Sequence, residues 1–243
     1  LSVSLIGMGS SIFHPEASRV AHLASGGKKG LAQSIFQVGG NAGGAIGPLL
    51  VALIVIPFGQ NYIGLFGVLA IVAVVILTYV GKWYQIHLKP KTEVIPANQP
   101  TSKLPKSKII FALGILLVLI FSKYFYMASM TSYFTFYLIN KFHVSVQESQ
   151  IYLFVFLASV AAGTILGGPL GDRYGRKLII WVSILGAAPF TLLLPHAGLE
   201  ATIILSISIG LIISSAFSAI LVYATELIPG KVGMIAGLFF GFA

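Results

Sequence analysis

The chain has 243 residues, of which 57% are hydrophobic and only 9% are charged. Soluble domains carry roughly 25% charged residues, so this composition and a mean hydropathy of +0.96 exclude an ordinary soluble fold. The formal net charge is +9, but the cations lie in gaps between apolar runs, which argues against a nucleic-acid-binding protein. Cysteine is absent, so neither a disulfide framework nor a thiolate metal site is available.

Apolar runs long enough to cross a bilayer, about 20 residues each, recur along the chain. Complete spans are predicted at 32–56, 63–80, 109–138, 151–170, 178–194 and 201–225. A first helix over 1–24 and a last one over 232–243 are interpreted as partial spans. The predicted fold class is an all-α membrane protein with six complete spans and two partial ones, and we expect the chain to be a piece of a longer protein.

One long polar segment, 82–108, interrupts the apolar runs. Its four prolines and scattered lysines predict a flexible or extended linker between one helix bundle in 1–81 and another in 109–243. If the spans alternate in direction, all 15 Lys and Arg residues except Lys123 and Lys141 fall on one side. The positive-inside rule places that side, linker included, in the cytoplasm.

A short basic segment joins the spans at 151–170 and 178–194. Its sequence is Gly168-Pro-Leu-Gly-Asp-Arg-Tyr-Gly-Arg-Lys177, in which Gly171 and Gly175 permit a tight reversal. Over ten positions it resembles the loop signature of the major facilitator superfamily. The resemblance implies a helical bundle of two six-helix halves joined by a cytoplasmic loop, with substrate at the midplane between them. The chain would then begin in the fourth helix and end in the eleventh.

The same segment is interpreted as a loop that switches conformation. Asp172 is expected to contact neighbouring helix ends, or Arg173 and Arg176, in one access state only. It would then act in switching between inward-open and outward-open forms and not in binding. The residues assigned to this switch loop are Gly168, Gly171, Asp172, Arg173, Gly175, Arg176 and Lys177.

Five further segments narrow the resemblance. They are Phe13-His-Pro-Glu-Ala-Ser-Arg19, Phe36-Gln-Val-Gly-Gly-Asn41, Lys123-Tyr-Phe-Tyr-Met-Ala-Ser129, Ala216-Phe-Ser-Ala-Ile-Leu-Val-Tyr223 and Glu226-Leu-Ile-Pro-Gly-Lys-Val-Gly233. Together they are similar to the fosmidomycin resistance transporters, a bacterial branch of the superfamily, over essentially the whole chain. The resemblance implies proton-coupled export of a small anionic drug by alternating access. It implies a monomeric protein of the bacterial inner membrane that needs no cofactor.

Lys123 lies well inside its predicted span. An ammonium at the bilayer centre costs about 2.5–3.5 kcal/mol on insertion scales, so it needs a partner or a wet cavity. On a helix, one face holds this lysine together with Met130 and the phenols of Tyr126, Tyr133 and Tyr137. We predict that Lys123 and the three tyrosines bind a small anionic substrate. The alternatives are a lysine that extends to the membrane interface and one that pairs with Glu16.

Three polar residues of the first helix, His14, Glu16 and Arg19, form a second candidate group. Glu16 and Arg19 are three residues apart and can meet on one helix face, and Pro15 can kink the helix between them and His14. A carboxylate and an imidazole in a partly dry site can titrate near neutral pH. We predict a role in proton coupling; the alternative is an ordinary helix end at the cytoplasmic interface.

A polar stripe recurs every four residues at Gln33, Gln37 and Asn41. Such side chains are expected to face a cavity or another helix and not lipid, and Gln37 and Asn41 are predicted to line the substrate path. The alternative is hydrogen bonding between helices alone. Further along, Gly43-x-x-x-Gly47-Pro48 resembles the core of the antiporter motif but lacks the glycine pair after the proline. Its small residues are also explained by close helix packing.

The sequence argues against an enzyme. Membrane-embedded transferases that handle prenyl phosphates bind magnesium through clustered acidic residues, but Asp172 is the only aspartate and no two acidic residues are close in sequence. The His-Glu-x-x-His pattern of a metallopeptidase is also missing. A permease for another organic anion and a non-transporting membrane scaffold remain as alternatives.

Overall fold

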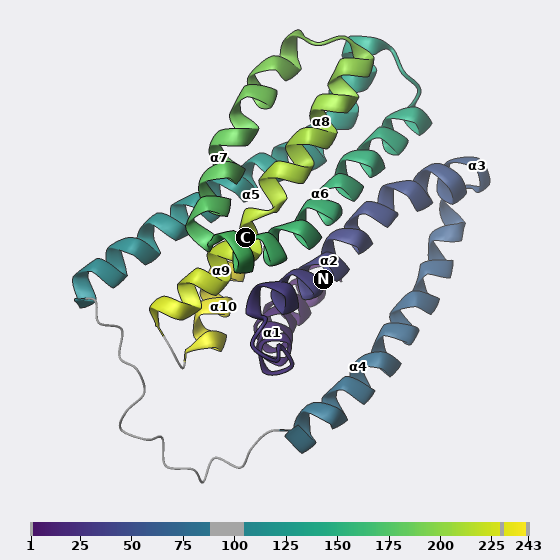
Figure 1. Cartoon of the computed structure of the whole chain (residues 1–243). Coiled ribbons are helices and arrows are strands. Elements are labelled where there is room, and N and C mark those ends of the chain that lie inside the picture. The colour runs from purple at the N-terminus through teal and green to yellow at the C-terminus, as the bar shows by residue number, and fades with distance from the viewer. Residues whose placement is uncertain (1, 88–104, 229–230, 242–243) are drawn as a thin grey trace.

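The computed structural model describes residues 2–87, 105–228 and 231–241, and every regular element within those ranges is a helix (Figure 1). The long elements are α1 (Ser2–Leu23), α2 (Lys29–Leu50), α4 (Gly67–His87), α5 (Lys106–Phe142), α6 (Val146–Tyr174), α7 (Arg176–Leu193), α8 (Leu199–Ser214), α9 (Ala216–Leu227) and α10 (Val232–Gly241). Shorter pieces extend them: a π-helix (Val51–Val55), α3 (Ile56–Phe58) and two 3₁₀ turns (Gln60–Phe66 and Leu194–His196).

Six of these helical segments are long and apolar enough to cross a membrane. They run over 29–58, 60–87, 106–142, 146–174, 176–196 and 199–227. They coincide with the six complete spans predicted from the hydrophobic runs, and α1 and α10 with the two partial ones. The prediction of an all-helical membrane protein is therefore confirmed.

The predicted linker is shorter than expected at both ends. Helix α4 continues to His87 and α5 begins at Lys106, so positions 82–87 and 106–108 are helical. Lysines at these ends do not break a helix, because lysine is a good helix former. The rest of the predicted linker, 88–104, lies outside the described residues.

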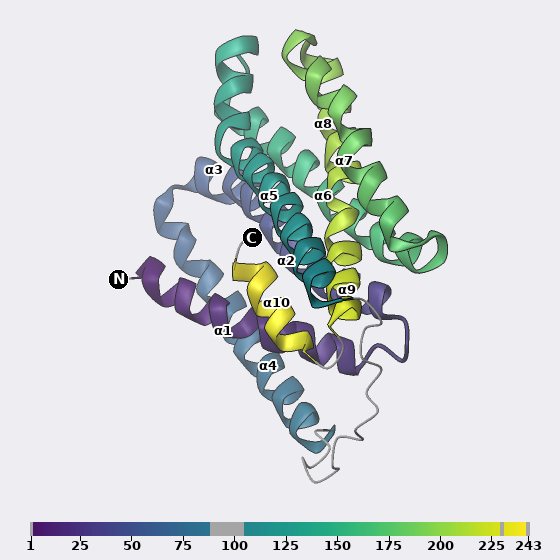
Figure 2. The same ribbon diagram turned by 90° about the vertical axis from the view of Figure 1, so that its left-hand side faces the viewer.

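Helix α6 lies at the centre of the helix packing, between α2 on one side and α8 on the other (Figures 1 and 2). Helix α9 continues the path of α8 after a break at Ser215. Helix α1 lies beside α10, across one end of the bundle (Figure 2). Segments from before and after the linker are thus packed against each other.

Glycines of α6 let the neighbouring backbones approach closely. A Cβ on Gly163 would overlap the carbonyl of Leu211 in α8, and one on Gly167 would overlap the backbone of Ser215. On the opposite face, a Cβ on Gly168 would overlap the Ser34 hydroxyl and the Gly30 carbonyl of α2. Small residues at helix contacts of this kind are typical of membrane proteins.

The glycines of the antiporter-like motif have no such role. A Cβ on Gly43, Gly44 or Gly47 of α2 would meet nothing within 4 Å among the residues that the structure describes. Within the described part of the chain, close packing therefore does not account for this motif. Pro48 lies inside α2, and the π-helix over 51–55 follows it directly, which is a typical adjustment to the amide that proline lacks.

The reversal between α6 and α7 is narrower than predicted. Helix α6 continues to Tyr174, and α7 begins at Arg176. Only Gly175 turns the chain, with a φ of 93° that favours glycine. Gly168 and Gly171 are helical, so their role is packing and not the turn.

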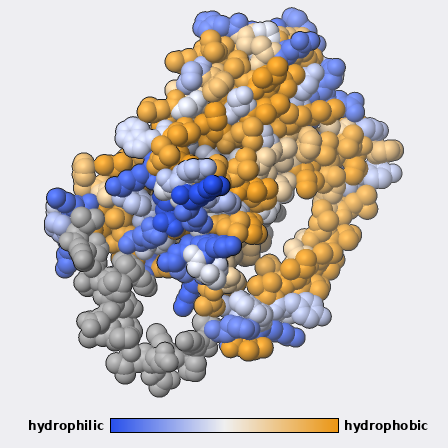
Figure 3. All heavy atoms as spheres, in the orientation of Figure 1, coloured by the Kyte–Doolittle hydropathy of each residue, from blue (hydrophilic) through white to orange (hydrophobic). Residues whose placement is uncertain are grey.

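The outer surface is mostly apolar, as Figure 3 shows for one face. Large side chains such as Phe111, Phe125 and Trp181 are more than half exposed. Hydrophilic residues gather in Figure 3 near the α6–α7 turn and at the opposite end of the bundle. This distribution fits a bundle surrounded by lipid with polar groups at its two ends.

Candidate functional site

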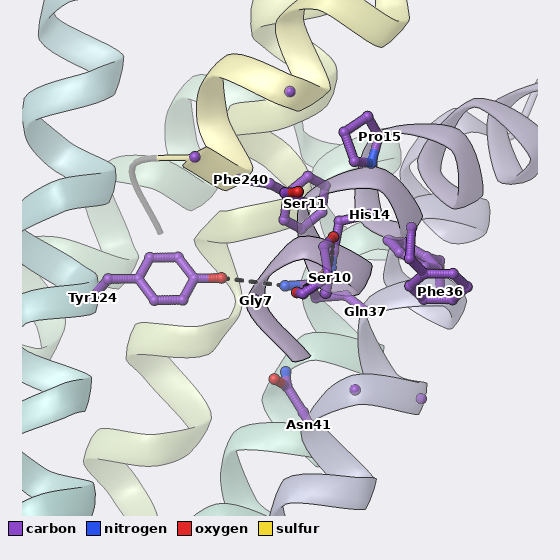
Figure 4. A pocket seen from close by; sticks show the side chains of 15 residues that line it. Gly7, Ser10, Ser11, His14, Pro15, Phe36, Gln37, Asn41, Tyr124 and Phe240 are labelled. Atoms are coloured by element: carbon purple, nitrogen blue, oxygen red, sulfur yellow. Dashed lines mark hydrogen bonds between the residues drawn. The ribbon is translucent and has the colours of Figure 1, made fainter. Parts of the chain in front are cut away.

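A cavity of about 990 Å³ lies among α1, α2, α5 and α10 (Figure 4). Its wall is contributed by helices from both sides of the linker. The lining residues are Gly7, Ser10, Ser11, Phe13, His14, Pro15, Phe36, Gln37, Gly39, Gly40, Asn41, Tyr124, Gly237, Phe240 and Gly241. Glycines and aromatic rings supply most of the wall, and a few hydroxyl, amide and imidazole groups face the space.

Two amides of the polar stripe on α2 reach across to later helices. The Gln37 Nε2 donates to the Tyr124 hydroxyl at 3.2 Å (Figure 4), and the Asn41 Nδ2 donates to the Thr164 hydroxyl at 2.8 Å. Both residues line the cavity. The stripe thus faces a cavity and other helices at once, because the spacing of four keeps it on one side of α2.

Gln33, the remaining residue of the stripe, makes buried contacts outside the cavity. Gln33 is buried and its Oε1 accepts from the Ser18 hydroxyl at 3.0 Å, while its Nε2 is buried without a partner in the described part of the chain. Ser34, also buried, donates to the Ser218 hydroxyl of α9 at 3.0 Å. Sequence reasoning missed Ser34 and Tyr124, because an isolated serine and one phenol among several carry no distinctive pattern.

The three residues predicted to act together in proton coupling do not form one cluster. His14 lines the cavity, where its Nδ1 lies 2.9 Å from the Ser10 carbonyl and its ring 5.1 Å from the Phe240 ring. Glu16 lines a second cavity of about 590 Å³ among α1, α2 and α4, and pairs with Arg19 at 3.8 Å. Residues two apart on a helix do not face each other, so only Glu16 and Arg19 meet as predicted.

Lys123 lies halfway along α5 but does not line the cavity. Its Nζ lies 3.5 Å from the Ser214 carbonyl and 5.4 Å from the centre of the Phe217 ring. Within the described ranges no carboxylate lies within ion-pair distance of it, and Glu16 has Arg19 as its partner. The Tyr124 and Phe217 rings stand edge to face, 5.6 Å apart, beside this ammonium.

The tyrosines predicted to share a wall with Lys123 are dispersed. Tyr126 accepts from Thr191 of α7 at 3.4 Å, and Tyr137 donates to the Leu194 carbonyl at 3.2 Å. Tyr133 is 69% exposed. None of the three is among the residues that line the cavity. Tyr126 and Tyr137 are partly buried against a core cluster that includes Met130 and Phe134. The structure therefore does not bring the three phenols to this cavity, and their role in substrate binding stays a prediction.

Charged groups of the switch loop join four helices, α2, α6, α7 and α9. Asp172, near the end of α6, accepts from the Leu31 N–H in the first turn of α2 at 3.2 Å and from Arg176 at 3.2 Å. Arg176 also donates to both oxygens of Glu226 at the end of α9, at 2.6 Å each. Arg173 forms no salt bridge with Asp172, and both lie in the part of the chain that the structure describes. The Arg173 guanidinium lies over the Tyr174 ring.

Comparisons with known proteins agree with this architecture. The sequence profile of the Major Facilitator Superfamily matches residues 1–243. The chain belongs to the major facilitator superfamily.

Two curated members of the superfamily are similar along the chain. The Fosmidomycin resistance protein of Escherichia coli (strain K12) is 56% identical over 248 residues, covering 100% of this chain and 60% of that protein. An uncharacterized transporter of the superfamily from Bacillus subtilis (strain 168), YfnC, is 45% identical over 244 residues, covering 99% of this chain and 59% of that protein. The chain thus spans about 60% of their length. No solved structure matches it.

The groups that line the cavity are suited to binding a small molecule, as a membrane transporter of this superfamily requires. Amide, hydroxyl and imidazole groups can bind a small polar molecule, and the glycines leave room for it. Among the residues that the structure describes, those lining the cavity include no acidic side chain.

Proposed function

We propose that the protein is a proton-coupled exporter of a small anionic compound, such as fosmidomycin, that works by alternating access. The observation that carries this proposal is the cavity between the two halves, bridged by the Gln37–Tyr124 hydrogen bond. The similarity to a protein named for fosmidomycin resistance supports the choice of substrate. In this proposal 1–81 and 109–243 belong to the two halves of a monomer in the bacterial inner membrane.

In this proposal the substrate site comprises Gln37, Asn41 and Tyr124. The place of Tyr124 in the cavity lining and its hydrogen bond from Gln37 support including it. Lys123 supplies the positive charge from behind the Tyr124 and Phe217 rings. In the described part of the chain no carboxylate pairs with Lys123. A charge acts over a longer range in a medium of low dielectric constant than in water. An anion in the cavity is therefore favoured even without direct contact with the ammonium.

Proton coupling is assigned to His14 on the cavity side of α1 and to the Glu16–Arg19 pair on its other side. The two groups share one helix, so a change in the charge of the pair can shift the position of His14 relative to the substrate. Pro15 between them is the point at which α1 can bend.

Switching is assigned to the Asp172–Arg176–Glu226 group and the N-terminus of α2. The contact of Asp172 with the Leu31 N–H joins the end of α6 to a helix of the other half. Opening the transporter toward this end, which we place in the cytoplasm, requires that contact to break. Its hydrogen bonds thus favour the closed arrangement at this end.

The test is fosmidomycin flux into vesicles that contain the purified full-length protein. We expect counterflow of labelled fosmidomycin, and uphill movement when a pH gradient is applied. Counterflow without any response to the pH gradient would indicate a facilitative permease instead. The absence of flux for phosphonates and for other small organic anions would overturn the transporter assignment and favour a scaffold.

A further inference from the structure

The helix that crosses the membrane over 199–227 is broken near its middle. Helix α8 ends at Ser214, Ser215 forms a turn, and α9 begins at Ala216. The region is buried: Ser214 is 2% exposed and Ala216 is 1% exposed. In a membrane the last four carbonyls of a helix have no backbone partner and no water to replace it, so other groups must satisfy them.

Side chains supplement the backbone at the carbonyls that end α8. The Ser215 amide and hydroxyl both donate to the Ile212 carbonyl, at 3.3 and 2.7 Å. The Ser214 hydroxyl donates to the Gly210 carbonyl at 2.6 Å, with the Leu211 carbonyl 3.4 Å away. Two further partners come from different helices. Ser183 of α7 donates to the Ile213 carbonyl at 2.9 Å, and Lys123 of α5 to the Ser214 carbonyl at 3.5 Å.

The neighbouring helix α6 is shaped to receive the break. Gly163 and Gly167 lie against the Leu211 carbonyl and the Ser215 backbone, at distances that exclude a Cβ on either glycine. The break is therefore enclosed by three helices, α5, α6 and α7. This enclosure distinguishes it from a local irregularity of one helix.

We propose that the end of α8 is the partner that holds the Lys123 ammonium inside the membrane. Carbonyl oxygens at the end of a helix carry a partial negative charge, and the Ser214 carbonyl lies 3.5 Å from the Lys123 Nζ. A partial charge does not cancel that of the lysine, so a net positive charge stays close to Tyr124. Through its contact with the Ser214 carbonyl, Lys123 in turn stabilises the break between α8 and α9. It thus acts as a positioning residue for α9. This deepens the proposed function and rests on it for the anionic substrate, but not for the contact itself.

Hydrogen–deuterium exchange of the full-length protein without substrate tests the contact directly. Lys123→Met should speed the exchange of the amides of 211–219 about tenfold, since it removes one hydrogen bond from a charged group. Ser183→Ala should accelerate the same segment, because it frees the Ile213 carbonyl while the lysine stays in place. Lys141→Met, on the same helix, is the control. Lys141 donates to the Pro195 and Ala197 carbonyls, so its effect should be confined to 194–199.

Unchanged exchange over 211–219 in both Lys123→Met and Ser183→Ala would overturn the inference. Binding of fosmidomycin, measured on the same samples, separates this result from the proposed function. Accelerated exchange in a protein that binds no phosphonate would leave the helix-end contact standing and remove the substrate assignment. Loss of fosmidomycin binding in Lys123→Met with unchanged exchange would remove the helix-end contact and leave the substrate assignment standing. A retained fosmidomycin Kd with slower counterflow in Ser183→Ala would show that the bend acts on movement and not on affinity.

Discussion

The Asp172 carboxylate lies directly against Gly30. A Cβ on residue 30 would stand 2.6 Å from its Oδ1, and the next amide, that of Leu31, donates to Oδ2 at 3.2 Å. A carboxylate is favoured at the N-terminus of a helix, where free N–H groups and the helix dipole point toward it. Gly30 thus lets two helices that are distant in sequence meet at one end of the bundle.

Replacing Gly30 with alanine should weaken this contact. The added methyl group displaces Asp172, and a hydrogen bond to a charged group contributes about 1.5–3 kcal/mol. We expect fosmidomycin counterflow by the full-length protein to fall about tenfold with normal membrane insertion. Gly44→Ala on the same helix is the control, since its Cβ would meet nothing within 4 Å. Equal losses in the two variants would contradict the prediction.

The bond between Arg176 and Glu226 should show measurable coupling. Their side chains are 22% and 39% exposed, so solvent screening limits the coupling to about 1 kcal/mol or less. A double-mutant cycle isolates this coupling free energy. It compares the free energies of unfolding, measured in detergent, of Arg176→Gln, Glu226→Gln and the double variant. The coupling should shrink as salt is added. Strictly additive single variants would show that the pair contributes nothing.

Two glycines one turn apart on α6 should respond differently to alanine. A Cβ on Gly167 overlaps the Ser215 backbone, whereas one on Gly171 lies 3.6 Å from the Ala219 Cβ, an ordinary contact. Gly167→Ala should destabilise the protein by about 1–3 kcal/mol. Gly171→Ala should be neutral or stabilise it by up to about 1 kcal/mol through helix propensity. Thermal unfolding in detergent measures both, and the opposite ranking would show that the α6–α8 packing is wrong.

Tyr124 and Tyr133 test which phenol of α5 belongs to the substrate site. Tyr124→Phe removes the acceptor of the Gln37 amide at the cavity, which should weaken fosmidomycin binding about three- to tenfold, the range for a lost hydrogen bond. Tyr133→Phe, at an exposed position, should leave the dissociation constant unchanged. Equilibrium binding to the purified full-length protein measures both. A larger loss of affinity in Tyr133→Phe than in Tyr124→Phe would support the substrate-binding tyrosines predicted from sequence.

Neutralising Glu16 should separate coupling from substrate movement. Glu16→Gln removes the titratable partner of Arg19, so export against a gradient, driven by pH, should be lost while counterflow persists. Uphill export into inverted vesicles measures the first and tracer exchange the second. Glu200→Gln changes an exposed acid at the start of α8 and should affect neither. Undiminished uphill export by Glu16→Gln would remove this residue from the coupling proposal.

The amino-acid sequence alone determined the membrane class, the number of complete spans and the motif that joins α6 to α7. These follow from local properties: an apolar run of about 20 residues must cross the bilayer as a helix, because only a helix satisfies its own backbone there. The pairing of Glu16 with Arg19 was also predictable, since residues three apart meet on any helix. The spacing of Gln37 and Asn41 likewise placed them on one face.

Only the tertiary structure decided which partners those faces meet. Periodicity put Lys123 and three tyrosines on one side of α5, but the packing of that helix against α6 and α9 leaves Tyr124 at the cavity. The break at Ser215 has no distinctive sequence signal, and neither does the carbonyl it presents to Lys123. Such contacts join residues about 90 positions apart, and their geometry depends on how closely the glycines of α6 let the backbones approach.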